Sequence, residues 1–149
     1  MVFLLSRREH HLFRFLFRLA RRTRRARATL SRDPAGAPDA STAAGFADTM
    51  AAHHDACRTS AERWLKDPAH CVRGRGGGFG LTLSATETET LLQAVNAARV
   101  GAWEALGSPD FEMDEPIAPD AQSNIRAIVV MQLADHFVEQ LLRAIHEKD

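Results

Sequence analysis

The sequence predicts a mainly α, four-helix bundle-like single domain with a small β-hairpin before the third helix. Three observations predict it. Apolar residues recur at helical spacing in four segments that Pro- and Gly-rich stretches separate. Two Ser-x-x-Glu sequences have the form of helix-initiating capping boxes. Five of the nine glycines lie between positions 74 and 80, which is typical of a turn. A length of 149 residues and 45% hydrophobic residues suit one globular domain.

The first predicted helix extends from about residue 7 into the twenties. Ser6-Arg7-Arg8-Glu9 is the first capping box, in which the serine oxygen accepts a backbone amide and the glutamate reaches back. One face of this helix is apolar, and further phenylalanines spread around the rest: Leu5, Leu12, Leu16, Leu19, Phe13, Phe15 and Phe17. Another face carries arginines at helical spacing: Arg7, Arg14, Arg18, Arg21 and Arg25.

A linker over residues 33–40 separates this N-terminal segment, residues 1–32, from a helical domain over residues 41–149. Two prolines and a glycine between positions 31 and 40 indicate the linker. We expect the N-terminal helix to dock on the domain. The second helix spans about residues 41–66, and Asp67-Pro68 ends it. Its apolar residues recur at helical spacing: Phe46, Met50, Cys57, Ala61 and Trp64.

The glycine-rich stretch 74–80 predicts the turn of a short hairpin, with Val72 on one side and Leu81-Thr82-Leu83 on the other. Ser84-Ala85-Thr86-Glu87 is the second capping box. The third helix follows it to about residue 106, and Gly107 stands where a left-handed cap is expected. The inward positions of this helix are Leu91, Val95, Ala98, Ala102 and Leu106.

An acidic, proline-broken connection over residues 110–120 leads to the last helix, which spans about residues 120–145. Its apolar positions are so numerous that we expect it to be the most buried element: Ile128, Val130, Met131, Ala134, Phe137, Val138, Leu141, Leu142 and Ile145.

The formal net charge of zero is the sum of two opposite halves. Residues 1–32 hold ten arginines and one acidic residue, so their charge is +9. Residues 33–149 hold nine basic and eighteen acidic residues, so their charge is −9. The arginine face can neutralise phosphates, anionic lipid or an acidic protein surface. Alternatively it is a solvated face paired with acids of the same chain or of a second subunit. We further expect it to dock on the acidic connection 110–120, in the same chain or in a dimer mate.

The sequence favours a cytoplasmic protein without a transmembrane segment. Two cysteines without a Cys-x-x-Cys motif suit a reducing compartment. The apolar run Val2–Leu5 is too short for a signal peptide, and no stretch reaches the ~20 apolar residues of a membrane span. The arginine-rich segment also fits the composition of a mitochondrial-type transit peptide, which is an alternative to a structural helix.

The sequence does not match the common motifs for catalysis, cofactor binding or metal binding. The glycine cluster has Phe79 where a dinucleotide loop needs glycine, and no Gly-Lys-Ser/Thr follows. The alternating acids from Asp110 onward lack the glycine and the final acid of a calcium loop. His53, His54 and Cys57, completed by Cys71 with His70, have spacing that permits zinc, but solvent-facing histidines beside a buried cysteine are the favoured interpretation. We predict no catalytic residues, metal or cofactor.

A polar cluster on the third helix is the second candidate site after the arginine face. Asn96, Arg99 and Trp103 stand at i, i+3 and i+7, in line with apolar positions. The Arg99 guanidinium can stack on Trp103. A half-buried arginine needs an acceptor, and Asp135 or Glu139 on the last helix are candidates. The favoured interpretation is a structural contact that joins the third and fourth helices, and a ligand site is the alternative.

Residues 81–109 carry a resemblance to a known family. The run Leu-Thr-Leu-Ser, then glutamate, Leu-Leu, Asn96, Arg99, Trp103 and Leu106-Gly-Ser-Pro resembles an uncharacterised bacterial family of small helical proteins, the domain of unknown function numbered twenty-seventeen and its relatives. The likeness covers about residues 41–145. The resemblance implies a helical fold and a link to proteostasis or regulation, but no catalytic residues.

Together these observations favour an uncharacterised non-enzymatic interaction or regulatory module with a protein partner. Homodimerisation is a further expectation, because the first helix has apolar residues on more than one face. The alternative is binding of nucleic acid or another anionic surface through the arginine-rich helix. A metal-dependent enzyme using His53, His54 and Cys57 is the remaining alternative.

Overall fold

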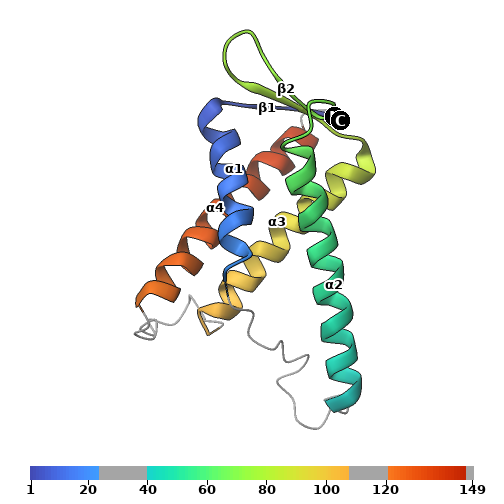
Figure 1. Cartoon of the computed structure of the whole chain (residues 1–149), viewed down its shortest axis with the longest axis vertical. Helices are drawn as coiled ribbons and strands as arrows, with labels where there is room; N and C mark the ends of the chain where they lie inside the picture. The colour runs from blue at the N-terminus through green and yellow to red at the C-terminus, as the bar shows by residue number, and fades with distance from the viewer. Residues whose placement is uncertain (24–39, 108–120, 147–149) are drawn as a thin grey trace.

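The computed structural model describes residues 1–23, 40–107 and 121–146, and it confirms the predicted mainly α fold. Within those residues four helices pack together, and a small sheet lies across one end of them (Figure 1). The elements follow in the order β1 (Val2–Leu5), α1 (Arg7–Ala20), α2 (Ala40–Trp64), β2 (Cys71–Arg73), β3 (Phe79–Thr82), α3 (Ala85–Ala105) and α4 (Ala121–His146). The described residues cover almost none of the predicted linker, and Arg25 and the acidic connection 110–120 lie outside them.

Both predicted capping boxes are present. The Glu9 amide donates to Ser6 Oγ over 3.1 Å, and the Ser6 amide donates to Glu9 Oε2 over 2.7 Å. Ser84 and Glu87 make the same pair of contacts at the start of α3. These contacts satisfy backbone amides that the first turn of a helix leaves without partners, so both helices begin where the sequence predicts. Gly107 has a φ of +86°, as expected for the end of α3.

α3 is the central helix of the bundle. It packs most extensively against α4 and α2, and it also contacts α1 (Figure 1). Four of its five predicted inward residues are buried, and Ala98 is partly buried. α1 contributes Phe13, Leu16 and Phe17 to the core, and the Phe13 ring stacks on Phe137 of α4 with the centroids 4.0 Å apart. The apolar face of the arginine-rich helix is therefore part of the domain core.

The apolar residues that recur at helical spacing in the second helix are buried only in its second half. Phe46 and Met50 are exposed, whereas Cys57, Ala61 and Trp64 are buried. Figure 1 shows the first half of α2 extending beyond α1, α3 and α4, so none of the other described helices covers it there. Helical spacing predicts which residues share a face, but a neighbour is needed to bury that face. Leu142, an apolar position of the last helix, is likewise 38% exposed.

The predicted hairpin is present, but its register and its sheet differ from the expectation. Val72 of β2 pairs with Gly80 of β3, so the second strand begins before Leu81. The sheet has a further strand, β1, from the N-terminal apolar run, and Leu5 belongs to this strand rather than to the first helix. The order is β1-β3-β2, with both pairs antiparallel. Pairing between residues about eighty positions apart leaves no local signal in the sequence.

Candidate functional site

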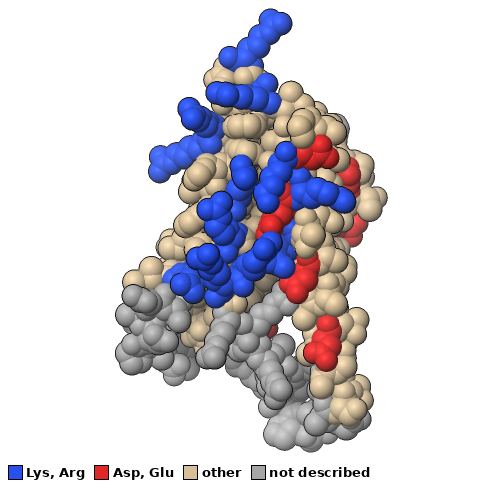
Figure 2. Space-filling view, viewed as in Figure 1, with Lys and Arg blue, Asp and Glu red and all other residues tan. Residues whose placement is uncertain are grey.

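A basic depression lies along the exposed face of α1 and is the principal candidate site. It has a volume of about 250 Å³ and is lined by Arg14, Arg18, Arg21, Arg22, Glu62 and Lys66. Five basic residues thus surround one acidic residue. Figure 2 shows basic side chains gathered over this face of the molecule, with few acidic ones among them.

The helix builds this depression because its two faces differ. Phe13, Leu16 and Phe17 point into the core, so the arginines that lie at helical spacing from one another must face outward. Of the predicted arginine face, the structure gathers Arg14, Arg18 and Arg21. Arg7 lies in the first turn of α1, also exposed, and takes no part in lining the depression.

One contact partly neutralises the depression. Nη2 of Arg21 lies 2.7 Å from Glu62 Oε2, and this ion pair joins the end of α1 to α2. The other carboxylate oxygen of Glu62 is buried and has no hydrogen-bond partner among the described residues. Considering residues 1–23, 40–107 and 121–146, which the structure describes, no ion pair involves Arg14, Arg18 or Lys66. The depression therefore keeps an excess of positive charge.

A second depression of about 270 Å³ adjoins the first through Arg21, which lines both. Its floor consists of small residues of α3, and its wall includes Arg58 and Thr23. Nη2 of Arg58 lies 3.2 Å from Asp55 Oδ1, so this arginine is already paired within its own helix. The positive character is thus concentrated on the α1 side.

The predicted polar cluster on α3 is an exposed contact between two helices. Nη1 of Arg99 lies 3.2 Å from Asp135 Oδ1, which confirms the predicted link to the fourth helix. Asn96 and Arg99 are exposed rather than half-buried, whereas Trp103 is partly buried. A shallow cavity of about 550 Å³ is lined by Arg99, Val100, Trp103, Met131 and Asp135. Asn96 does not line it, so the three predicted residues do not form one site.

Of the candidate zinc residues, His53 and Cys57 lie in contact, but no third ligand joins them among the residues that the structure describes. Cys57 is buried, with its Sγ 3.6 Å from His53 Nε2 and 3.6 Å from Gln93 Oε1. Burial raises the pKa of the Cys57 thiol, which disfavours the thiolate that binds metals. His70 instead lies between two carboxylates. The described residues contain no group of three or more His, Cys, Asp or Glu side chains that could hold a metal ion.

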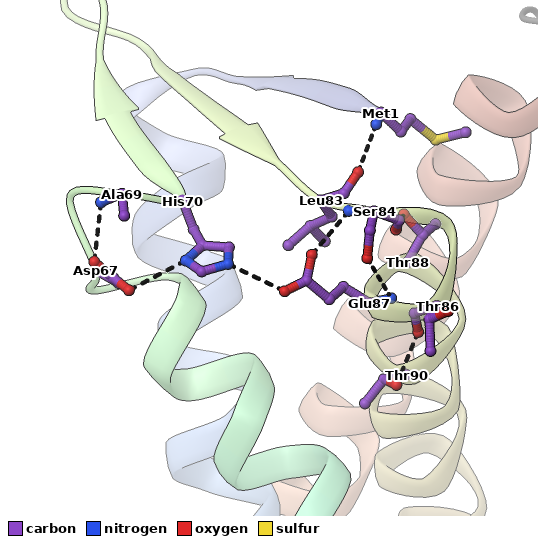
Figure 3. A network of polar contacts seen from close by, with 10 residues as sticks. All are labelled: Met1, Asp67, Ala69, His70, Leu83, Ser84, Thr86, Glu87, Thr88 and Thr90. Carbon is purple, nitrogen blue, oxygen red and sulfur yellow. Dashed lines mark hydrogen bonds and ion pairs between the residues drawn. The ribbon is translucent and has the colours of Figure 1, made fainter.

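A network around His70, which the sequence does not predict, joins three parts of the chain (Figure 3). Its Nδ1 lies 3.1 Å from Asp67 Oδ2, and its Nε2 lies 3.1 Å from Glu87 Oε1. Asp67 also accepts from the Ala69 amide, and the Glu87 carboxylate accepts from the Ser84 amide in the capping box of α3. The capping box identified Glu87, but nothing in the spacing from position 70 to position 87 indicates that His70 contacts it.

The environment of this network shifts all three pKa values. Burial lowers the pKa of His70, but hydrogen bonds and charges from Glu87 and Asp67 outweigh it and raise the pKa above the usual value. Contacts with the Ser84 amide and hydroxyl, and then with His70, lower the pKa of Glu87. The Ala69 amide, and then His70, lower the pKa of Asp67. The network therefore favours a charged imidazolium between two carboxylates.

His10 is a second histidine whose role only the fold reveals. It is buried on α1, its Nε2 lies 3.0 Å from the Leu65 carbonyl oxygen, and its ring stacks on Phe79 with the centroids 3.9 Å apart. These contacts join α1 to the end of α2 and to β3, which is a structural role.

Comparisons of the chain with protein-family models, with curated proteins and with solved structures found no match. None of the described helices is both long enough and apolar enough to cross a membrane. The candidate site therefore rests on its own geometry and charge.

Proposed function

We propose that this protein is a non-enzymatic interaction module that binds an acidic protein partner through the basic depression of α1. The observation that carries the proposal is the set of five basic residues around one acid in a single exposed depression. A regulatory or adaptor role of this kind agrees with the link to proteostasis that the family resemblance implies.

The arrangement suits a large anionic surface better than a buried small ligand. Exposed arginines present planar guanidinium groups that pair with carboxylates and phosphates in bidentate geometry. Because α1 is fixed in the core by Phe13 and Phe17, these groups are held in a defined row. Complementary charge raises the association rate and selects the partner, and the effect weakens as salt rises.

Nucleic acid is the second candidate partner. Arg14, Arg18 and Arg21 stand at i, i+4 and i+7 on α1, so their side chains form a line of charges about one helical turn apart. Such a line can contact successive phosphates of a nucleic acid, and the affinity would then fall steeply with salt.

Binding measurements with two polyanions test the proposal. The full chain is titrated with polyglutamate and, separately, with single- and double-stranded DNA, each across a salt series. Saturable binding of polyglutamate and weak binding of DNA supports a protein partner, whereas tighter binding of DNA supports the second candidate. Absence of binding to either polyanion at low salt contradicts both.

A charge-reversal pair locates the surface. Arg14→Glu with Arg18→Glu is expected to weaken binding about tenfold or more, since it places acids inside the depression. Arg73→Glu with Arg75→Glu is the matched control, because it changes the net charge equally at the hairpin, outside the depression. If both double variants weaken binding equally, the basic depression is not the site.

A further inference from the structure

The outer face of the sheet carries apolar side chains that are exposed rather than packed in the core. Along β1 the side chains alternate, so Phe3 is buried while Val2 and Leu4 are 58% and 85% exposed. The register places Leu4 and Val72 on either side of Gly80, and Val72 is 57% exposed. We call Val2, Leu4 and Val72 the apolar tip.

These three side chains form one surface because of the strand pairing. Val2 pairs with Thr82, and Leu4 and Val72 both pair with Gly80, so all lie on the side of the sheet opposite Phe3 and Leu81. Gly80 has no side chain, and this leaves Leu4 and Val72 protruding beside it. Single exposed apolar residues are ordinary, but a contiguous exposed group marks an interaction surface.

Four arginines lie next to the apolar tip, at the end of the sheet where β1 and β2 both finish; Arg73 pairs with Phe79 and therefore leaves this end from the face opposite Val72. Arg7 and Arg8 follow β1, and Arg73 and Arg75 lie at the end of β2 and in the hairpin turn; all four are exposed. Within the described residues none of them forms an ion pair. Figure 2 shows basic side chains projecting from this end of the molecule. The surface thus combines protruding apolar groups with unneutralised positive charge.

We propose that this end of the protein binds an anionic lipid surface, with the apolar tip inserted between headgroups and the four arginines contacting lipid phosphates. Apolar insertion and electrostatic attraction to anionic lipids act together in peripheral membrane binding. The charge argues against a second copy as the occupant, because two such faces would bring eight arginines together. Lipid also accepts protruding side chains without a pocket of matching shape.

This surface is distinct from the basic depression. None of the residues of the apolar tip, nor Arg7, Arg8, Arg73 or Arg75, lines that depression. The proposal therefore stands independently of the partner proposed for α1, and separate variants can test the two.

Vesicle co-sedimentation of the full chain, carrying any tag at its C-terminus, tests the proposal. Wild type is expected to bind phosphatidylserine–phosphatidylcholine vesicles and to bind pure phosphatidylcholine vesicles at least about tenfold more weakly, with binding to the anionic vesicles reduced by salt. Leu4→Ser with Val72→Ser is expected to reduce binding to anionic vesicles about tenfold or more while leaving polyglutamate binding unchanged. Arg73→Glu with Arg75→Glu is expected to have a similar effect on vesicle binding.

Matched controls decide the outcome. Ile125→Ser alters a residue of α4 that is 61% exposed, and it is expected to leave vesicle binding unchanged. Arg14→Glu with Arg18→Glu should affect polyglutamate more than vesicles. Circular dichroism checks that each variant is folded. Equal vesicle binding by wild type and the Leu4–Val72 variant would overturn the proposal. So would a light-scattering result in which wild type is a dimer and this variant a monomer, because the patch would then be a self-association surface.

Discussion

His70 joins the turn after α2 to the first turn of α3 through two carboxylates, Asp67 and Glu87. Its charge is therefore linked to the folded state, since the unfolded chain lacks this arrangement. A group whose pKa is raised on folding stabilises the fold most when it is protonated. The pKa values of the two carboxylates are lowered on folding, so these groups stabilise the fold most when they are deprotonated.

The pH dependence follows from these directions. The contribution of His70 is complete below the imidazole pKa of the unfolded chain, about 6.5, and is lost as pH rises through the higher folded value. The contributions of Asp67 and Glu87 are complete above the unfolded carboxyl pKa, about 4, and are lost as pH falls through the lowered folded values. The network should therefore stabilise the protein most between these two limits.

We predict that His70→Gln lowers the free energy of unfolding more at about pH 5.5 than at about pH 8.5, measured by urea denaturation. His11→Gln is the control, since His11 is exposed on α1. An equal loss of stability at both pH values would show that the charge of His70 does not contribute.

At the scale of elements, β1 depends on a close approach to the hairpin. A Cβ atom on Gly78 would lie 2.9 Å from the carbonyl oxygen of Leu5, which is closer than real Cβ atoms approach backbone oxygen. Gly76, in the same turn, has nothing within 4 Å of such an atom. The glycine-rich turn therefore has no room for a side chain at position 78, but it has room for one at position 76.

Gly78→Ala is expected to reduce the free energy of unfolding by about 1–3 kcal/mol, because the strand or the turn must shift to relieve the overlap. For Gly76→Ala we expect a change within about 0.5 kcal/mol. Thermal or urea unfolding of the two variants measures the difference, and similar stabilities would contradict the close packing of β1 against the turn.

For the whole molecule, the N-terminal segment and the remaining helices share one core. β1 pairs with β3, and α1 packs against α3 and α4, so residues 1–20 contact elements from the middle and the end of the described chain. Leu16 is fully buried in this core. Such contacts predict that the segments unfold together.

We predict a single unfolding transition, in which tryptophan fluorescence, reporting Trp64 and Trp103, coincides with far-ultraviolet circular dichroism. Leu16→Ala should shift both transitions together and cost about 2–5 kcal/mol. Separate midpoints for the two signals, or a shift of only one, would mean that α1 unfolds as an independent unit.

The sequence by itself determined the helices and their beginnings. Capping boxes and helical spacing are local signals, so Ser6, Ser84 and the apolar positions of α3 predict their elements correctly. The opposite charges of residues 1–32 and 33–149 also predict that α1 carries a basic surface. The link from Arg99 to Asp135 was predicted because both residues lie on faces that the helical period defines.

Only the tertiary structure decided the contacts between residues that lie far apart in the sequence. β1 forms because β3 offers backbone groups from about eighty residues away, and His70 finds Glu87 because the hairpin returns the chain to the start of α3. Phe46 lies at the correct helical spacing, yet it is exposed because none of the described elements packs against it. Periodicity fixes which side chains share a face, but only packing determines whether that face is buried, paired or left for a partner.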